Sequence, residues 1–82
     1  MNSFKVIKES QNLILAFQKL RKIIFDNCSE NDKTIWQKRL TKKLYLCNRI
    51  IRNAKLSIGV QRKLQTVIEQ LKTARKLILK QQ

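Results

Sequence analysis

The sequence has no proline, no histidine and a single glycine, and aromatic residues make up only 6% of it. A β-sheet protein needs a turn after every strand, and glycine and proline are among the residues that form these turns. The shortage of both favours long helices, so we predict an all-α fold. Histidine is also the side chain most often used for proton transfer in catalysis. Without it, and without paired carboxylates on one helix face or a glycine-rich phosphate loop, we expect no enzyme activity and no cofactor.

Long apolar runs and clustered cysteines are lacking as well. The longest apolar run covers residues 13–17, whereas roughly 20 apolar residues are needed to span a bilayer. We therefore predict no transmembrane helix, and the lack of a small-residue cleavage site after this run argues against a signal peptide. The chain is expected in the cytoplasm. Cys28 and Cys47 are too few for a disulfide framework and lack partners for a metal site, so we expect two reduced, half-buried thiols.

Apolar residues recur with the period of a helix in three stretches. Because 82 residues have room for one core, residues 1–82 are predicted to form a single helical domain. We expect helices near residues 4–28, 32–54 and 58–80, separated by residues suited to helix caps, namely Ser29, Asn31 or Asp32 in the first break and Ser57 in the second. The predicted fold class is a three-helix bundle, or a helical unit that completes its core by oligomerisation.

Each predicted helix has a face of apolar residues spaced three or four positions apart, which we expect to point toward the core. These positions are Val6, Ser10, Leu13, Phe17, Leu20 and Ile24, widened by Ile7, Ile14 and Cys28, in the first helix; Trp36, Leu40, Leu44, Cys47, Ile51 and Ala54 in the second; and Val60, Leu64, Val67, Leu71, Ala74 and Ile78 in the third.

Positive charge dominates the composition: 19 Lys and Arg face 5 Asp and Glu, which gives a formal net charge of +14. Fourteen of the basic residues lie in residues 33–82, where Glu69 is the one acidic residue. Five residues of the second predicted helix share one side, opposite its apolar face, and Arg39 and Lys43 lie beside them. We call these five residues, Lys38, Lys42, Tyr45, Arg49 and Arg52, the cationic stripe.

Three apolar residues of the third predicted helix, Ile68, Leu77 and Leu79, fall outside its core-facing repeat. Leftover apolar side chains on a small protein suggest a second contact surface. We therefore predict that this surface binds a partner or a second copy of the chain, for which a dimer is the simplest closed form.

Three kinds of ligand would account for the cationic stripe, namely nucleic acid, anionic lipid and another protein. Nucleic acid would bind through phosphates along it, with Tyr45 available for stacking, although no known nucleic-acid-binding motif accompanies the charge. Anionic lipid is a weaker alternative, because the most apolar stretch, residues 4–28, is the least charged. We favour a regulator that docks an acidic or amphipathic segment of another protein. In that interpretation the stripe orients the encounter, and Ile68, Leu77 and Leu79 supply apolar anchors.

The length, the Lys-, Ile- and Asn-rich helical composition and the start MNSFKVIKES resemble those of the lysis-inhibition accessory proteins of T-even phages. This resemblance covers the whole chain and implies a cytoplasmic co-antiholin. Such a protein helps the periplasmic antiholin to delay lysis by binding the cytoplasmic N-terminal part of the holin. It would then lie in the host cytoplasm, held at the inner membrane through its partner.

A second resemblance runs from Leu40 to Leu71, LTKKLYLCNRIIRNAKLSIGVQRKLQTVIEQL. This stretch is similar to the last two helices of class II bacteriocin immunity proteins, which are also small, basic and cytoplasmic. Both resemblances imply a helical protein that restrains a membrane-active partner from inside the cell.

Overall fold

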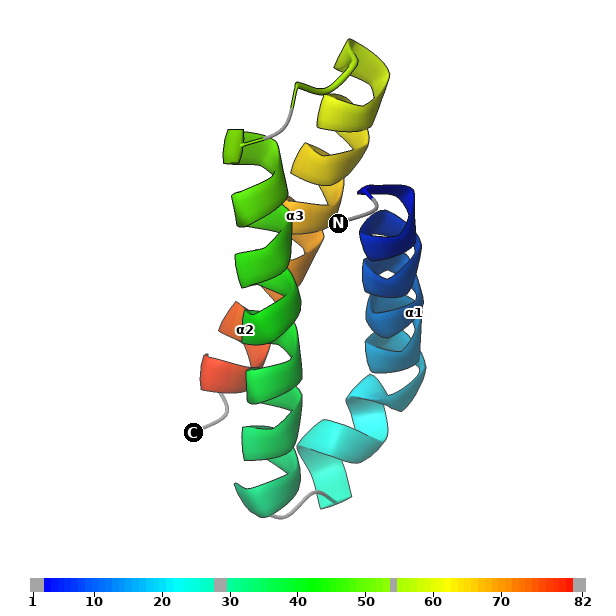
Figure 1. Cartoon of the computed structure of the whole chain (residues 1–82). Coiled ribbons are helices and arrows are strands. Elements are labelled where there is room, and N and C mark those ends of the chain that lie inside the picture. Colours follow the sequence, from blue (N-terminus) through cyan, green and yellow to red (C-terminus); the bar gives the residue numbers. More distant parts are fainter. Residues whose placement is uncertain (1–2, 28–29, 54, 81–82) are drawn as a thin grey trace.

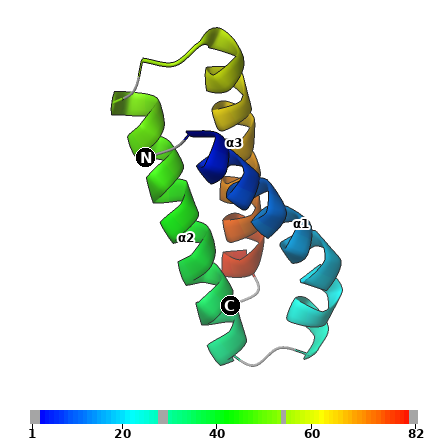
Figure 2. The same cartoon turned by 45° about the vertical axis from the view of Figure 1, so that its right-hand side comes forward.

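A computed structural model describes residues 3–27, 30–53 and 55–80 of the chain. These residues form three α-helices, α1 (Ser3–Asn27), α2 (Glu30–Asn53) and α3 (Ile58–Lys80), without any strand. Helices α1 and α3 run in the same direction and α2 runs in the opposite one (Figures 1 and 2). Each helix packs against the other two. The predicted all-α three-helix bundle is confirmed, and every predicted helix end lies within two residues of the observed one.

The second break follows the predicted capping chemistry. The backbone N–H of Val60 donates to Ser57 Oγ at 3.4 Å, and the N–H of Gln61 donates to the Ser57 carbonyl at 3.0 Å. Ser57 is therefore the N-cap of α3, as predicted. In the first break, Asn31 and Asp32 lie inside α2 and are not its cap, whereas Ser29 falls outside the described residues.

The core is formed by side chains of all three helices. Leu40, Leu64, Leu71 and Ile78 are fully buried, and the ring of Phe17 packs edge-on against Trp36 with 5.9 Å between the ring centroids. Because these groups come from different helices, their burial holds the three helices together. The buried apolar residues are Val6, Ile7, Ile14 and Phe17 of α1; Trp36, Leu40, Leu44, Cys47 and Ile50 of α2; and Leu64, Val67, Ile68, Leu71, Ala74 and Ile78 of α3.

One predicted surface anchor is wrong. Ile68 is only 6% exposed and belongs to the core, as does the neighbouring Val67. The reason is that α3 packs against α1 and α2 at once, so its buried face must be wider than the narrow seam of a two-helix coiled coil. Two other positions of α3 behave differently from Ile68, since Leu77 is half-buried and Leu79 is 42% exposed.

The core-facing positions of α1 and α2 also depart in part from the prediction. Along α1, Val6 is buried, Leu13 is half-buried and Leu20 is 39% exposed. These residues are seven positions apart, and a straight helix drifts by about 20° per seven residues, so this row rotates out of the core. In α2, Ile50 is buried and Ile51 is only half-buried. The expectations for Cys28 and Ala54 concern positions outside the described part of the chain, and for Ile24 the structure describes the backbone of α1 but not the side chain.

Leu71 and Leu79 provide a matched test of the core. We expect Leu71→Ala to lower the free energy of unfolding by about 2–5 kcal/mol, because it opens a cavity at a fully buried position. Leu79→Ala removes the same atoms from an exposed position, so it should cost less than about 1 kcal/mol. Urea denaturation followed by circular dichroism measures both values. Equal costs at the two positions would contradict this assignment of the core.

Candidate interaction surface

All five residues of the cationic stripe are exposed on α2. The buried residues Leu40, Leu44 and Cys47 belong to the other side of the same helix, as the spacing predicts. Tyr45 is 59% exposed, which is high for an aromatic side chain that usually packs its ring and leaves only the hydroxyl in water. The stripe therefore presents an aromatic ring among cations, and its role in binding a partner stays a prediction.

The two basic residues beside the stripe contact the bundle itself. The guanidinium of Arg39 lies over the ring of Trp36, with 5.7 Å from its central carbon to the ring centroid, a cation–π arrangement. The ammonium of Lys43 forms an ion pair with Glu9 on α1. Lys43 therefore helps to hold α2 against α1, whereas Arg39 is exposed and packs on Trp36 of its own helix.

A groove of about 500 Å³ runs between α2 and α3. Lys38 and Lys42 of the stripe line it together with Arg75 of α3. The Nε atom of Arg75 is buried and has no hydrogen-bond partner within the protein. Arg75 was not among the predicted site residues, because nothing in the local spacing of the third helix reveals that it meets the stripe. The remaining lining residues are Thr34, Gln37 and Thr41.

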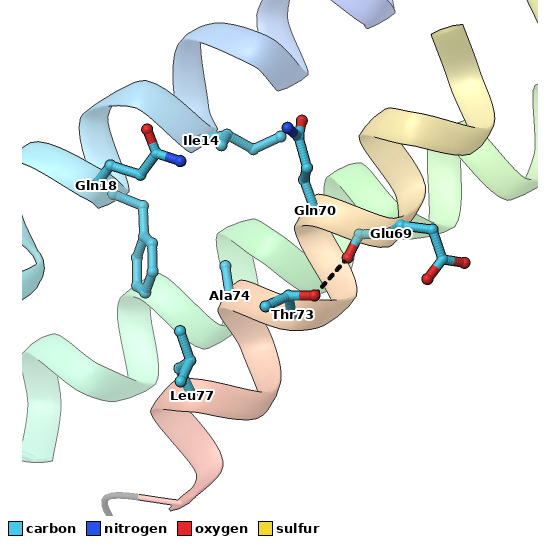
Figure 3. Close-up of a pocket in the computed structure, with 8 residues that line it drawn as sticks. Ile14, Gln18, Glu69, Gln70, Thr73, Ala74 and Leu77 are labelled. Carbon is cyan, nitrogen blue, oxygen red and sulfur yellow. Dashed lines mark hydrogen bonds between the residues drawn. The ribbon is translucent and has the colours of Figure 1, made fainter. Parts of the chain in front are cut away.

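The two predicted apolar anchors that stay near the surface, Leu77 and Leu79, do not line this groove. Leu77 lines a separate cleft of about 260 Å³ between α1 and α3, together with the buried residues Ile14, Phe17 and Ala74. Figure 3 shows Ala74 and Leu77 on α3 across this cleft from Ile14 and Gln18 on α1. Because the cleft and the groove share no lining residue, the structure does not combine the stripe and Leu77 into one pocket.

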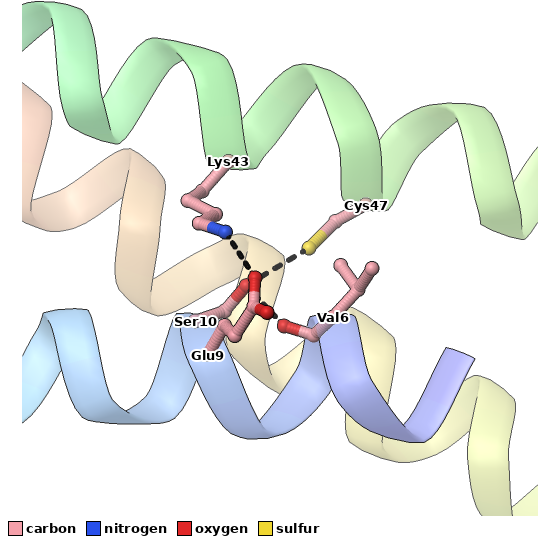
Figure 4. A network of polar contacts seen from close by, with 5 residues as sticks. All are labelled: Val6, Glu9, Ser10, Lys43 and Cys47. Carbon is pink, nitrogen blue, oxygen red and sulfur yellow. Dashed lines mark hydrogen bonds and ion pairs between the residues drawn. The ribbon is translucent and has the colours of Figure 1, made fainter. Parts of the chain in front are cut away.

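A polar cluster joins α1 to α2, with side chains of the two helices pointing toward one another (Figure 4). The hydroxyl of the buried Ser10 donates to the Val6 carbonyl at 2.7 Å, and its oxygen lies 3.5 Å from the Cys47 sulfur. The Ser10 oxygen and the Cys47 sulfur are within hydrogen-bond distance, and either group can act as the donor. Burial raises the pKa of this thiol, which outweighs the opposing effects of the Ser10 hydrogen bond and of Lys43. Cys47 is therefore a protonated, structural thiol.

The Glu9–Lys43 pair is the second part of this cluster. Lys43 donates a hydrogen bond to the carboxylate of Glu9 and also attracts it electrostatically, and both effects lower the pKa of Glu9 below its ordinary value of 4.5. Burial opposes these two effects by raising the pKa of Glu9, and Lys5 lowers this pKa by less than burial raises it. The pair thus favours the charged carboxylate in the folded state and ties the middle of α2 to α1.

The described residues contain neither a cluster suited to a metal ion nor a helix suited to a membrane. There, no three His, Cys, Asp or Glu side chains come together in a way that would hold a metal ion. None of the three helices, over the residues described, is long and apolar enough to cross a membrane. The prediction that the protein is not an enzyme stays a prediction.

In comparisons with protein-family models, with curated proteins and with solved structures, the chain has no significant match. The interpretation of the surface therefore rests on its residues and their geometry.

The Glu9–Lys43 pair predicts a pH dependence. A carboxyl whose pKa is lowered by folding adds stability above its unfolded pKa, and this contribution is lost as the pH falls through the folded pKa. We therefore expect part of the loss of stability on acidification below about pH 5 to disappear in Glu9→Gln, because this variant has no carboxyl to protonate. Urea unfolding from about pH 7 to about pH 3 measures the dependence.

Glu69→Gln is the matched control, since it removes one carboxylate from an exposed position of α3. We expect the free energy of unfolding of Glu69→Gln to fall on acidification about as steeply as that of the parent, and more steeply than that of Glu9→Gln. The pairing would be contradicted if the two variants had the same pH dependence.

Proposed function

We propose that the protein is a small basic regulator that docks an acidic or amphipathic segment of another protein on the cationic stripe of α2. The observation that carries this proposal is the exposed Tyr45 within a row of exposed cations, on the helix side opposite the core. The cations of the stripe would attract and orient an acidic partner, and the ring of Tyr45 would then provide apolar contact area. Tyrosine and arginine are enriched among the residues that dominate binding energy.

The charge distribution supports an acidic partner. Residues 33–82 carry fourteen basic residues against the one acidic residue Glu69, and they include all of α3 and nearly all of α2. A surface of one sign attracts partners of the other and raises their association rate, an effect that salt screens. On α2, Lys43 is paired with Glu9, whereas the stripe cations Lys38, Lys42 and Arg49 are exposed and open to a partner.

The resemblance to T-even lysis-inhibition accessory proteins supports a specific partner. We propose that the docked segment is the cytoplasmic N-terminal part of a holin, and that docking delays lysis. The protein would then act in the host cytoplasm and lie at the inner membrane only through this partner. This role requires the chain to bind a protein, and it requires no catalysis.

Nucleic-acid binding is the second candidate function. The observation that favours it is the position of Arg75 beside Lys38 and Lys42 in the groove, which extends the basic surface from α2 onto α3. A phosphate backbone follows such a surface without sequence preference. A single-stranded oligonucleotide that binds more tightly than the holin segment, and loses affinity on the charge reversals below, would favour this candidate.

The first test compares two charge-reversal variants. We expect Lys42→Glu combined with Arg49→Glu to slow association with a peptide of the holin's cytoplasmic N-terminal segment by about tenfold or more at low salt, because the stripe then repels an acidic ligand. The matched control is Arg62→Glu with Lys63→Glu, which reverses two exposed charges on α3 beside a cleft facing α1. Stopped-flow binding over a range of salt concentrations measures both.

The control variant should associate faster than the stripe variant, and both should keep the circular dichroism of the parent. Equal slowing in the two variants would mean that only net charge matters. Unchanged association in the stripe variant would show that the stripe is a solvated face.

We also propose that the protein self-associates as a dimer. Several large apolar side chains remain exposed around the bundle, including Phe4 at 65% and Leu15 at 55% on α1. Their burial between two copies would lower the exposed apolar area. Sedimentation equilibrium at tens of micromolar should give about twice the mass of 9.8 kDa. A single species at the mass of one chain would contradict the proposal.

A further inference from the structure

The groove between α2 and α3 has the composition of an anion-binding site. Helices α2 and α3 lie side by side along this part of the bundle (Figure 2). Three cations from the two helices line the groove, and no acidic residue does. The lining residues are Thr34, Gln37, Lys38, Thr41, Lys42 and Arg75. Three positive side chains around one depression repel each other, so a bound anion would relieve an unfavourable arrangement.

Arg75 is the residue of the groove whose N–H donors have a fixed direction. Its Nε atom is buried and donates to no acceptor in the protein. Buried polar groups are nearly always hydrogen-bonded, and an unpaired donor on a charged group is especially costly. Glu69, which lies on the same helix, lines the cleft with α1 and not this groove. No carboxylate of the groove accepts from Arg75, so its guanidinium is left to water or to a ligand.

The donors present match a phosphate group better than a carboxylate. A guanidinium binds two oxygens of a phosphate side by side, and ammonium groups are suited to its remaining charge. A phosphate monoester carries close to two negative charges and three terminal oxygens, whereas a carboxylate has one charge and two oxygens. The Thr34 hydroxyl already donates to the Glu30 carbonyl at 2.9 Å, so Thr41 and Gln37 are the neutral donors that the groove offers.

We propose that the α2–α3 groove binds a doubly charged phosphate group, as free phosphate or as a phosphate monoester, with Arg75 as its directional ligand and Lys38 and Lys42 as its charge partners. This site goes beyond the docking of a protein segment on the stripe and does not depend on it. The two sites share Lys38 and Lys42, but Arg75 lies outside the stripe and Arg49 lies outside the groove. Changes at these two arginines therefore separate the sites.

The test is a titration of the full chain with inorganic phosphate and with glycerol 3-phosphate, at constant ionic strength in chloride buffer. We expect saturable binding of one phosphate per chain, measured by calorimetry. In two-dimensional ¹H–¹⁵N spectra, the side-chain Nε–H signal of Arg75 should shift with the same affinity. Acetate and dimethyl phosphate, each with a single charge, should bind more weakly.

Arg75→Gln and Arg49→Gln form the matched pair, since each removes one arginine from the same bundle. We expect Arg75→Gln to weaken phosphate binding by about tenfold or more, because it removes the charge-assisted hydrogen bonds, and Arg49→Gln to leave it nearly unchanged. The holin segment should show the opposite ranking. Arg75→Lys keeps the positive charge but lacks the paired N–H donors of the guanidinium, so we expect it to bind phosphate with intermediate affinity. This variant replaces Arg75→Gln in the test if Arg75→Gln does not fold.

Three results would overturn the proposal. Phosphate binding that does not saturate would mean general screening of a basic protein. Equal losses in Arg75→Gln and Arg49→Gln would mean that net charge, and not the groove, attracts phosphate. Acetate or dimethyl phosphate binding as tightly as phosphate would contradict the assignment of a doubly charged ligand. If phosphate binds as described while the holin segment does not bind, the groove is supported and the docking function fails.

Discussion

The structure depends on the burial of apolar side chains where α3 packs against both other helices. Leu64, Leu71 and Ile78 of α3 are fully buried, as is Leu40 of α2. This burial must offset the repulsion among the many cations of α2 and α3, since like charges three or four positions apart destabilise a helix by a few tenths of a kcal/mol per pair. Because the apolar sides of the helices face inward, the cations are left on the outside, and the cationic stripe is a consequence of the same packing.

The polar contacts between α1 and α2 fix how the stripe is presented. Lys43 pairs with Glu9, and Cys47 forms a hydrogen bond with Ser10, so α2 is held to α1 by two specific contacts in addition to the core. Arg39 stays over Trp36. Arg39 and Lys43 lie next to stripe positions in the sequence, and their contacts distinguish them from Lys38, Lys42 and Arg49, which are exposed and open to ligands.

Much of this could be predicted from the sequence, because helical periodicity and capping are local properties. The three helices, the Ser57 cap and the exposure of the stripe all follow from residue spacing. The departures come from packing between helices. Ile68 is buried because α3 has two neighbours, and Arg75 reaches the groove beside Lys38 only when α2 and α3 are placed together. No local pattern contains that information.

We propose that the stripe side of α2 is the surface through which the protein binds its partner. The most direct measurement is a map of amide ¹H–¹⁵N shift changes on the uniformly labelled chain when the holin's cytoplasmic N-terminal peptide is added. We expect the largest changes on α2 around Lys42, Tyr45 and Arg49. Changes confined to the α1–α3 cleft around Leu77, with α2 unaffected, would contradict it.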